Sequence, residues 1–288
     1  GRGRLQQGLE DEPLTHADGI PVTVTIGKGV YKVMVKRAEG PEGFRKVASL
    51  MQEKGRVVAF TGAGISVESG IPAFRGGQGL WEKYDPMEYA HISSFNRNPE
   101  KVWVMLREMS ALIFDARPNA AHTALGGLEQ RGLLKSVITQ NIDGLHHIAG
   151  NSDVIEYHGN HRSLVCLGCS TRVPLSAEAI SAHPYPRCER CGRALKPDVV
   201  FFGEGIPMME MVRASEAAST CNVMVIIGTS GVVYPAAEMP YVAKSNGAAI
   251  VEINVSPTPF TESISDYYFE GSAAQVLPEI LAYLDGPH

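Results

Sequence analysis

The sequence predicts an α/β fold, a doubly wound, Rossmann-like parallel sheet that carries a small zinc-binding insert domain. Three observations predict it. Short apolar segments alternate with helical stretches from about residue 42 onward, which is typical of parallel sheets with helical crossovers. Several of these segments lack polar alternation, as strands covered on both faces do. Two closely spaced cysteine pairs interrupt the alternation near the middle of the chain.

Residues 1–40 are predicted to form an N-terminal tail and a β-hairpin extension. The first 19 residues are polar and indicate a loose tail. Residues 20–26 and 30–36 alternate around the turn Gly27-Lys28-Gly29, a pattern that predicts a hairpin. Two interpretations of the hairpin stay open. It is either an extra edge ribbon without a catalytic role, or a surface that packs on the core or on a second copy in a homo-oligomer.

The main Rossmann-like domain is expected over residues 41–161 and 199–288. Its buried strands are predicted at 56–60, 136–139, 154–157, 223–228, 248–254 and 266–269. Its helices are predicted at 42–54, 100–114, 119–131, 207–219, 235–246 and 273–284. The segment between the third and fourth strands contains prolines and little helical signal, so residues 162–198 are assigned to an insert.

Composition and charge exclude some classes of protein. With 288 residues and 44% hydrophobic residues, the chain can bury one large core beside a small insert. A net charge of −5 argues against direct nucleic-acid binding, which requires a basic field. No apolar run reaches the roughly 18 residues of a membrane span, and the start is no signal peptide, so no membrane contact is expected. Five cysteines, four of them in pairs, indicate a reducing, cytoplasmic location, with Cys221 as a core thiol.

The two cysteine pairs predict a structural zinc site. Cys166 and Cys169 are followed, 18 residues later, by Cys188 and Cys191, a spacing within the range of four-thiolate zinc ribbons. Four protein thiolates would close the tetrahedron and leave no open position for water. Gly168 and Gly192 lie where such knuckles require tight turns. Four unrelated buried thiols would rarely show this spacing by chance.

Glycines follow the first predicted strand, in Thr61-Gly62-Ala63-Gly64-Ile65-Ser66. Glycines at the carboxyl end of a first strand let the backbone approach a pyrophosphate, while the next helix offers amide donors. The dinucleotide pattern G-x-G-x-x-G is incomplete, because Val67 occupies its third glycine position. A tight strand–helix turn is the alternative interpretation.

Polar residues also follow the second and third strands. Gln140, Asn141 and Asp143 would project into the crevice at the strand ends, where amides and carboxylates bind ribose hydroxyls or a carboxamide. A polar turn, with Asp143 as the cap of the next helix, explains the pattern equally well. His158 ends the third strand, and an imidazole there suits proton transfer. The alternative candidates are His122, His146, His147 and His161.

Several blocks together resemble the signature of the sirtuins, the NAD-dependent protein deacylases. The blocks are Gly62-Ala63-Gly64-Ile65-Ser66, Gly70-Ile71-Pro72-Ala73-Phe74-Arg75, residues 139–146, Tyr157-His158-Gly159, Gly228-Thr229-Ser230 and Ile253-Asn254. The cysteine insert lies between His158 and Gly228, where sirtuins carry theirs. The resemblance covers residues 42–286 and leaves the first 40 residues outside it.

The resemblance implies the cofactors, the substrate and the site residues. It implies an NAD-binding Rossmann-like domain, one structural Zn²⁺ per chain and an acyl-lysine protein or peptide as substrate. His158 would be the general base on a ribose hydroxyl, and Asn141 a second catalytic residue. The implied cofactor-binding residues are Gly62, Ala63, Gly64, Ile71, Phe74, Arg75, Trp81, Gln140, Asn141, Ile142, Asp143, Gly228, Thr229, Ser230, Asn254, Val255 and Ala273. The implied substrate-binding residues, which would clamp an extended peptide, are Val200, Phe201, Phe202, Gly203, Val232 and Val233.

In sirtuin chemistry the acyl group moves to ADP-ribose and nicotinamide is released. Sirtuins that remove succinyl or malonyl groups carry a Tyr and an Arg where this chain has Leu106 and Met109. Without that arginine a buried acyl carboxylate would be unpaired, so neutral acyl groups are expected to lodge against Met105, Leu106 and Met109. Arg107 is adjacent, but one helical step turns its side chain away.

Two other functions remain open on the sequence. The same NAD site could serve a protein mono-ADP-ribosyltransferase or an NAD hydrolase, which would release nicotinamide without acyl transfer. A non-enzymatic NAD-responsive binding module would use the insert and the hairpin as docking surfaces, and His158 would then be dispensable.

Overall fold

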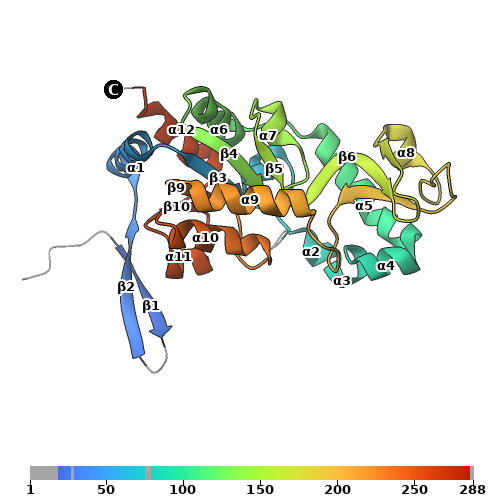
Figure 1. Ribbon diagram of the computed structural model, residues 1–288, viewed down its shortest axis with the longest axis horizontal. Coiled ribbons are helices and arrows are strands. Elements are labelled where there is room, and N and C mark those ends of the chain that lie inside the picture. The colour runs from blue at the N-terminus through green and yellow to red at the C-terminus, as the bar shows by residue number, and fades with distance from the viewer. Residues whose placement is uncertain (1–18, 27–28, 75–78, 286–288) are drawn as a thin grey trace, which may run out of the picture.

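The structure is a computed structural model of the chain and describes residues 19–26, 29–74 and 79–285, with side chains from Arg37 onward (Figure 1). The expected tail and the turn residues Gly27 and Lys28 lie outside the described residues. In the described part of the chain, no helix combines the length and the apolar character needed to span a bilayer.

The central sheet of the described chain has eight strands in the order β1-β2-β11-β10-β9-β3-β4-β5. All neighbours pair in parallel except β1 and β2. Its six core strands are β3 (Val57–Thr61), β4 (Leu134–Thr139), β5 (Val154–Glu156), β9 (Val223–Ile227), β10 (Ala249–Asn254) and β11 (Tyr267–Glu270). If these six strands are numbered 1 to 6 along the chain, they lie across the sheet in the order 3-2-1-4-5-6, which is the Rossmann order. The predicted doubly wound sheet is confirmed.

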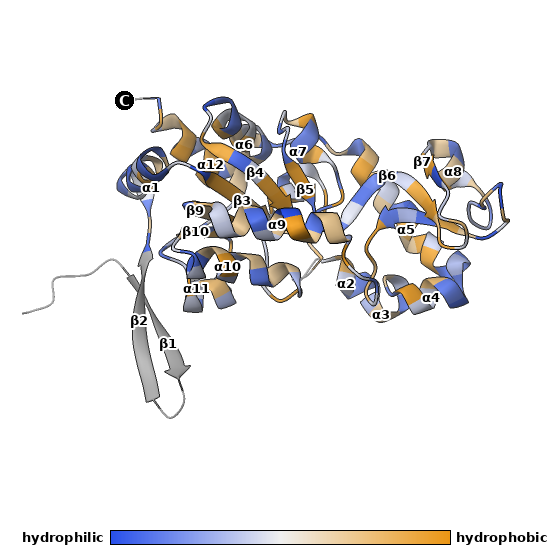
Figure 2. Ribbon diagram, in the orientation of Figure 1, coloured by the Kyte–Doolittle hydropathy of each residue, from blue (hydrophilic) through white to orange (hydrophobic). Residues whose placement is uncertain are grey.

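Helices cover both faces of this sheet. One face packs against α1 (Gly40–Lys54), α6 (Ala120–Gln130) and α12 (Ala273–Ala282). The other packs against α9 (Met208–Thr220), α10 (Met239–Ser245) and α11 (Pro259–Ser263). Along β3, Val57 and Ala59 enter the first core while Val58 and Phe60 enter the second. This division explains why β9 consists of apolar residues alone and why β3 is apolar up to Phe60. Figure 2 shows the central strands as largely apolar.

A second, smaller lobe has its own core. Its sheet, within the described residues, has three antiparallel strands: β6 (Gly159–Cys166), β7 (Arg172–Pro174) and β8 (Leu195–Val199). It packs with α5 (Pro99–Asp115) and three short helices that the sequence did not predict: α2 (Leu80–Lys83), α3 (Pro86–Tyr89) and α4 (Ile92–Arg97). Helices this short contain too few turns to show a hydrophobic period. Residues 80–115 therefore share a core with the cysteine insert, which also holds α8 (Ala177–Ser181).

The two strands of the predicted hairpin form one edge of the main sheet. Strand β1 (Gly19–Ile26) pairs with β2 (Gly29–Arg37), and β2 continues the sheet by pairing Lys36 and Arg37 with the start of β11. The guanidinium of Arg37 also donates to the carboxylate of Glu270 at 2.9 Å. The ribbon projects away from the body of the molecule (Figure 1).

Candidate active site

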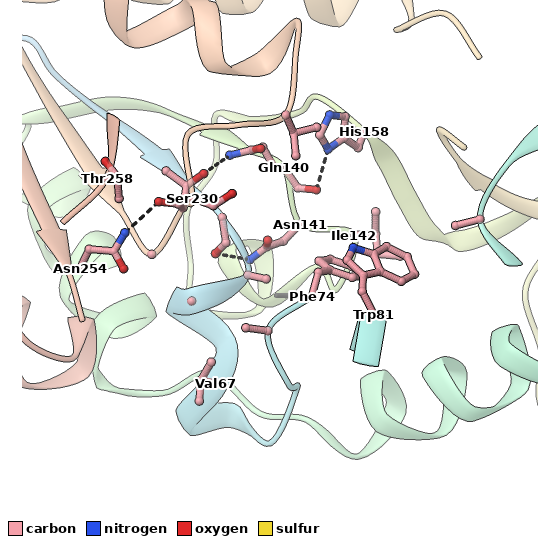
Figure 3. A pocket seen from close by; sticks show the side chains of 18 of the residues that line it. Val67, Phe74, Trp81, Gln140, Asn141, Ile142, His158, Ser230, Asn254 and Thr258 are labelled. Carbon is pink, nitrogen blue, oxygen red and sulfur yellow. Dashed lines mark hydrogen bonds between the residues drawn. The ribbon is translucent and has the colours of Figure 1, made fainter. Parts of the chain in front are cut away.

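A cleft of about 650 Å³ opens at the carboxyl ends of β3 and β9, between the two lobes (Figure 3). These strands are the two at which the strand order reverses, the position where open α/β sheets bind ligands. The segments after β3, β4, β9 and β10 line one part of the cleft, and residues of α5 and of the segment after β8 line the other.

The glycines after β3 allow a close backbone contact with the loop after β9. The Gly64 N–H donates to the carbonyl of Gly228 at 2.8 Å, and a Cβ on Gly64 would lie 2.6 Å from the Gly228 Cα. Gly228 itself has φ +58°, a conformation that favours glycine. The loop after β3 therefore crosses the loop after β9 in backbone contact. The expected helix after Gly62 is a 3₁₀ helix, η1 (Ala63–Ser69), and Val67 is 47% exposed.

Asn141 is held under the cleft by backbone and hydroxyl groups. Its amide donates to the Gly62 carbonyl at 3.1 Å and to the Ser66 hydroxyl at 3.2 Å. Ser66 in turn donates to one carboxylate oxygen of Asp143 at 2.8 Å. The other oxygen accepts, at 2.9 Å, the N–H of Leu145, the first residue of α7 (Leu145–Ile148). The N-cap of α7 is Gly144 and not Asp143, so the alternative interpretation is right about the polar turn but wrong about the cap. Burial raises the pKa of Asp143, and these hydrogen bonds partly offset the rise.

His158 has the geometry of a proton acceptor. Its Nδ1 lies 3.1 Å from the Gln140 carbonyl, and because a carbonyl only accepts, Nδ1 carries the proton and Nε2 is free (Figure 3). Gln140 is fixed by donating its own amide to the Thr229 hydroxyl at 2.9 Å. Burial lowers the pKa of His158 below 6.5, and the bond to Gln140 opposes this only in part. The imidazole is therefore neutral near pH 7.

The alternative histidines do not reach the cleft. His146 is buried, with Nε2 3.0 Å from the Thr61 hydroxyl, and burial lowers its pKa well below 6.5. His122 is buried beside it, with the two rings 5.0 Å apart. His161 is buried with Nε2 2.8 Å from the Ser110 hydroxyl. His147 forms a 3.5 Å ion pair with Glu156. Of these five histidines, His158 is the one that lines the cleft.

Most residues singled out from the sequence come together in this cleft. Those that line it are Gly62, Ala63, Gly64, Phe74, Trp81, Gln140, Asn141, Ile142, His158, Val200, Phe201, Phe202, Gly203, Gly228, Thr229, Ser230, Val233, Asn254, Val255 and Ala273. Ile71 and Asp143 instead line an adjoining cavity of about 30 Å³. Val232 is 48% exposed and is not in the lining, and Arg75 lies outside the described residues.

Several residues that line the cleft were not predicted from the sequence. They are Val67, Glu68, Ala73, Ala90, Ile206, Ser256, Pro257, Thr258, Pro259 and Gly271. The run 256–259 had a usable signal, because it directly follows Asn254 and Val255 at the carboxyl end of β10. The apolar lining residues could not be recognised from the sequence, because side chains of these types ordinarily fill protein cores.

The small-lobe end of the cleft is apolar. Met105 and Leu106 are each 2% exposed and line it together with Met109 and Phe201. Arg107 does point elsewhere, as expected: its guanidinium donates to the carbonyls of Ile180, Ala182 and Pro184 at 2.9, 2.8 and 2.6 Å. No cation of α5 therefore lines this end of the cleft among the described residues.

The four paired cysteines converge in the small lobe. Their sulfurs lie within 4.8 Å of one another, with Cys166 and Cys191 at 3.3 Å and Cys169 and Cys188 at 3.5 Å. Tetrahedral thiolates at the usual Zn–S length are about 3.8 Å apart, so the set fits Zn²⁺. Gly192 has φ +72°, as a knuckle requires, but in the first knuckle Ser170, at φ +58°, and not Gly168 has positive φ. None of the four lines the cleft.

Comparisons with known proteins agree with this geometry. The model of the Sir2 family matches residues 62–235, more than half of the chain. An NAD-dependent protein deacylase of Pyrococcus furiosus is 45% identical over 240 residues, covering 82% of this chain and 96% of the relative. A Sir2 homologue solved with NAD has a TM-score of 0.78 at 42% identity, covering 83% of this chain and 93% of that one. A Sir2 protein solved with a deacetylated p53 peptide and 3′-O-acetyl ADP-ribose has a TM-score of 0.79 at 34% identity, covering 83% and 97%.

Replacing a zinc ligand will remove the metal and destabilise the small lobe. The wild-type chain should contain one zinc ion, and Cys188→Ser should contain none. Because binding to a structural site is coupled to folding, we expect a loss of about 3 kcal/mol or more and a Tm lower by roughly 5–10 °C. Elemental analysis and calorimetry measure both. The control is Cys221→Ser, the same change at a buried thiol that donates to the Ala218 carbonyl, which should keep its zinc. A folded wild type without bound metal would contradict the assignment.

Proposed function

The chain belongs to the Sir2 family, and we propose that it removes neutral acyl groups from lysine side chains of proteins or peptides, with NAD as co-substrate. It is an NAD-dependent protein deacylase that transfers the acyl group to ADP-ribose. The observation that carries the proposal is His158, a neutral imidazole with a free Nε2 inside a cleft that is polar toward the main sheet and apolar toward the small lobe.

We assign NAD to the main-sheet side of the cleft. NAD, when bound, supplies nicotinamide as the leaving group and ADP-ribose as the acyl acceptor. Backbone groups around Gly62, Gly64 and Gly228 would hold the phosphates, and Asn254, Val255 and Ala273 the adenosine end. Asn141 is fixed for a contact with the carboxamide or the ribose by its bonds to Gly62 and Ser66. Phe74 stacks on Trp81 at 5.1 Å and would exclude water from the reacting end.

His158 would act on a ribose hydroxyl. Its Nε2 would accept the proton of that hydroxyl, so that the oxygen could bond to the acyl carbon as the bond from this carbon to the lysine nitrogen breaks and lysine leaves as the amine. Nδ1 would keep its proton in the bond to Gln140. The fixed tautomer means that the ring does not have to reorganise before the transfer. The zinc ion takes no part, because its four thiolate ligands lie away from the cleft.

The acyl-lysine peptide would lie between two loops. Residues 200–203 line one side and Val233 lines the other, the arrangement of a strand added between two edges. The first loop is already anchored to the small lobe: the Phe202 N–H donates to the Ala90 carbonyl at 2.9 Å, and the Ile92 N–H to the Phe202 carbonyl at 3.0 Å. The Val200 N–H donates to the His158 carbonyl at 2.8 Å, which joins the peptide loop to the proposed base.

We expect NAD-dependent loss of acetyl groups from lysine peptides, with O-acyl-ADP-ribose as product. In His158→Ala the rate should fall on the order of 10²- to 10⁴-fold. Because protonation inactivates a base and burial lowers the pKa of His158, kcat/KM should rise with pH along an acid limb whose midpoint lies below pH 6.5. Mass spectrometry of peptides and nucleotides across pH measures all three quantities.

The matched control for this prediction is His147→Ala, which removes an imidazole from α7, outside the cleft, and should leave the rate unchanged. Consumption of NAD with every peptide still acylated would indicate ADP-ribosyl transfer or NAD hydrolysis instead. Untouched NAD would favour the binding module.

We further propose that the acyl group is uncharged, because Leu106 and Met109 line the apolar end and Arg107 is engaged elsewhere. Succinyl-lysine should react at least about 100-fold more slowly than acetyl-lysine, since an unpaired carboxylate there costs about 3 kcal/mol. The double variant Leu106→Tyr with Met109→Arg should reverse this order, whereas Leu106→Met should not. Efficient succinyl removal by the wild type would refute the assignment.

We also propose that the hairpin joins two copies through β1, the outermost strand of the main sheet. Unpaired edges are templates for strand pairing. Deleting residues 1–37 should halve the mass measured by light scattering and leave the kinetics unchanged, because the cleft is built from other elements. The match to the relative from Pyrococcus furiosus covers 96% of that protein but only 82% of this chain. A protein of about the length of the shortened chain therefore exists in this family, which supports folding of the shortened chain. A monomeric full chain would contradict this proposal.

A reducing, cytoplasmic location is part of the same proposal. All five cysteines are free thiols, and four of them suit zinc as thiolates. An oxidising compartment would convert such closely spaced thiols into disulfides.

A further inference from the structure

Lys196 places a charged ammonium inside the small lobe, directly behind the peptide loop. The residue lies in β8 and is 2% exposed. It does not line the cleft, although the residues that follow it, Val199 to Glu204, all do. A buried ammonium is costly unless it is paired and hydrogen-bonded, so its partners show what holds it there.

The groups that contact this ammonium all lie in residues 197–204, the segment that directly follows Lys196 in the chain. The Lys196 Nζ donates to the Val199 carbonyl at 2.6 Å and to the Pro197 carbonyl at 3.1 Å. It forms an ion pair with the Glu204 carboxylate at 3.1 Å. It also lies 4.7 Å from the centre of the Phe201 ring, within the range of a cation–π contact. The ammonium therefore joins the start of the peptide loop to its end.

Glu204 passes this restraint to the peptide-binding backbone. The oxygen that pairs with Lys196 also accepts the Phe201 N–H at 2.9 Å. The Glu204 N–H donates to the Phe201 carbonyl at 3.0 Å, which closes a turn. Gly203 in this turn has φ +83°, and a Cβ there would lie 2.8 Å from the His91 ring. The turn is thus tied from within by the Lys196–Glu204 pair and packed from outside by His91.

We propose that Lys196 is a positioning residue for the acyl-lysine peptide: it holds the loop 199–204 in its binding shape before the peptide arrives. The inference rests on the proposed function, because it takes this loop as the peptide site. Lys196 acts through Glu204 and the loop backbone and not by touching the peptide. A loop that is already ordered does not lose that conformational entropy on binding, so peptide affinity depends on the pair. The nucleotide side is built from other segments and does not depend on it.

Three variants in the full-length, zinc-loaded protein test this role. Lys196→Met keeps the apolar stem and removes the ammonium, so the peptide KM should rise by about tenfold or more. Lys196→Arg keeps the charge and donors and should stay within about threefold of wild type. The matched control is Lys244→Met. Lys244 lies on α10 and forms an ion pair with Asp266 at 2.6 Å, so its removal should leave the peptide KM unchanged. Titration calorimetry with ADP-ribose should give the same Kd for all four proteins.

Two outcomes of these assays overturn the inference. One is a folded Lys196→Met variant with the wild-type peptide KM. The other is an equal loss of peptide and ADP-ribose affinity, because general destabilisation would weaken both. Neither result bears on whether the wild type is a deacylase, which its own reaction products decide.

Hydrogen exchange on the wild type tests the inference even if Lys196→Met does not fold. The Phe201 amide, which donates to Glu204, should be protected without peptide or nucleotide. Rapid exchange at Phe201 in the peptide-free protein would show that the loop is not held in advance and would refute the proposal.

Discussion

The site depends on one close backbone crossing, between the loop after β3 and the loop after β9. A side chain at Gly64 or Gly228 would separate the two loops. Their contact fixes the Gly62 carbonyl, which orients the Asn141 amide, and Thr229, which orients Gln140. Gln140 then sets the tautomer of His158. These glycines are therefore required first for a backbone contact within the protein itself.

The same crossing explains how one histidine differs from its neighbours. His146 and His161 are buried against hydroxyl groups and are held out of the cleft, so their rings are structural. His158 is partly buried and makes one hydrogen bond among the described residues, to a carbonyl, which leaves its Nε2 free. Burial lowers the pKa of His158 without removing the ring from the cleft. Of the five candidate histidines only His158, in the segment after β5, has a pKa lowered by burial and still lines the cleft.

The parts predictable from the sequence were those with a strong local pattern. Apolar strands before glycines and polar residues predicted the sheet and the cleft, and cysteine spacing predicted the metal cluster. The small lobe was harder, because α2, α3 and α4 have four to six residues each and no measurable period. Lys196 and Glu204 gave no signal either, because they meet through a turn, and charged residues in a sequence are ordinarily on the surface.

The small lobe also shows how a remote metal site can support the acyl end of the cleft. Helix α5 directs Met105 and Leu106 into the cleft, while Arg107 on the same helix binds three carbonyls of the insert. Trp103 adds a bond from its indole N–H to the Leu195 carbonyl at 2.9 Å, on the strand that leads to Lys196. The zinc cluster closes the other end of that insert. A zinc ion bound by these cysteines would therefore stabilise the insert on which both Met105–Leu106 and the loop 199–204 are packed, without taking part in the chemistry.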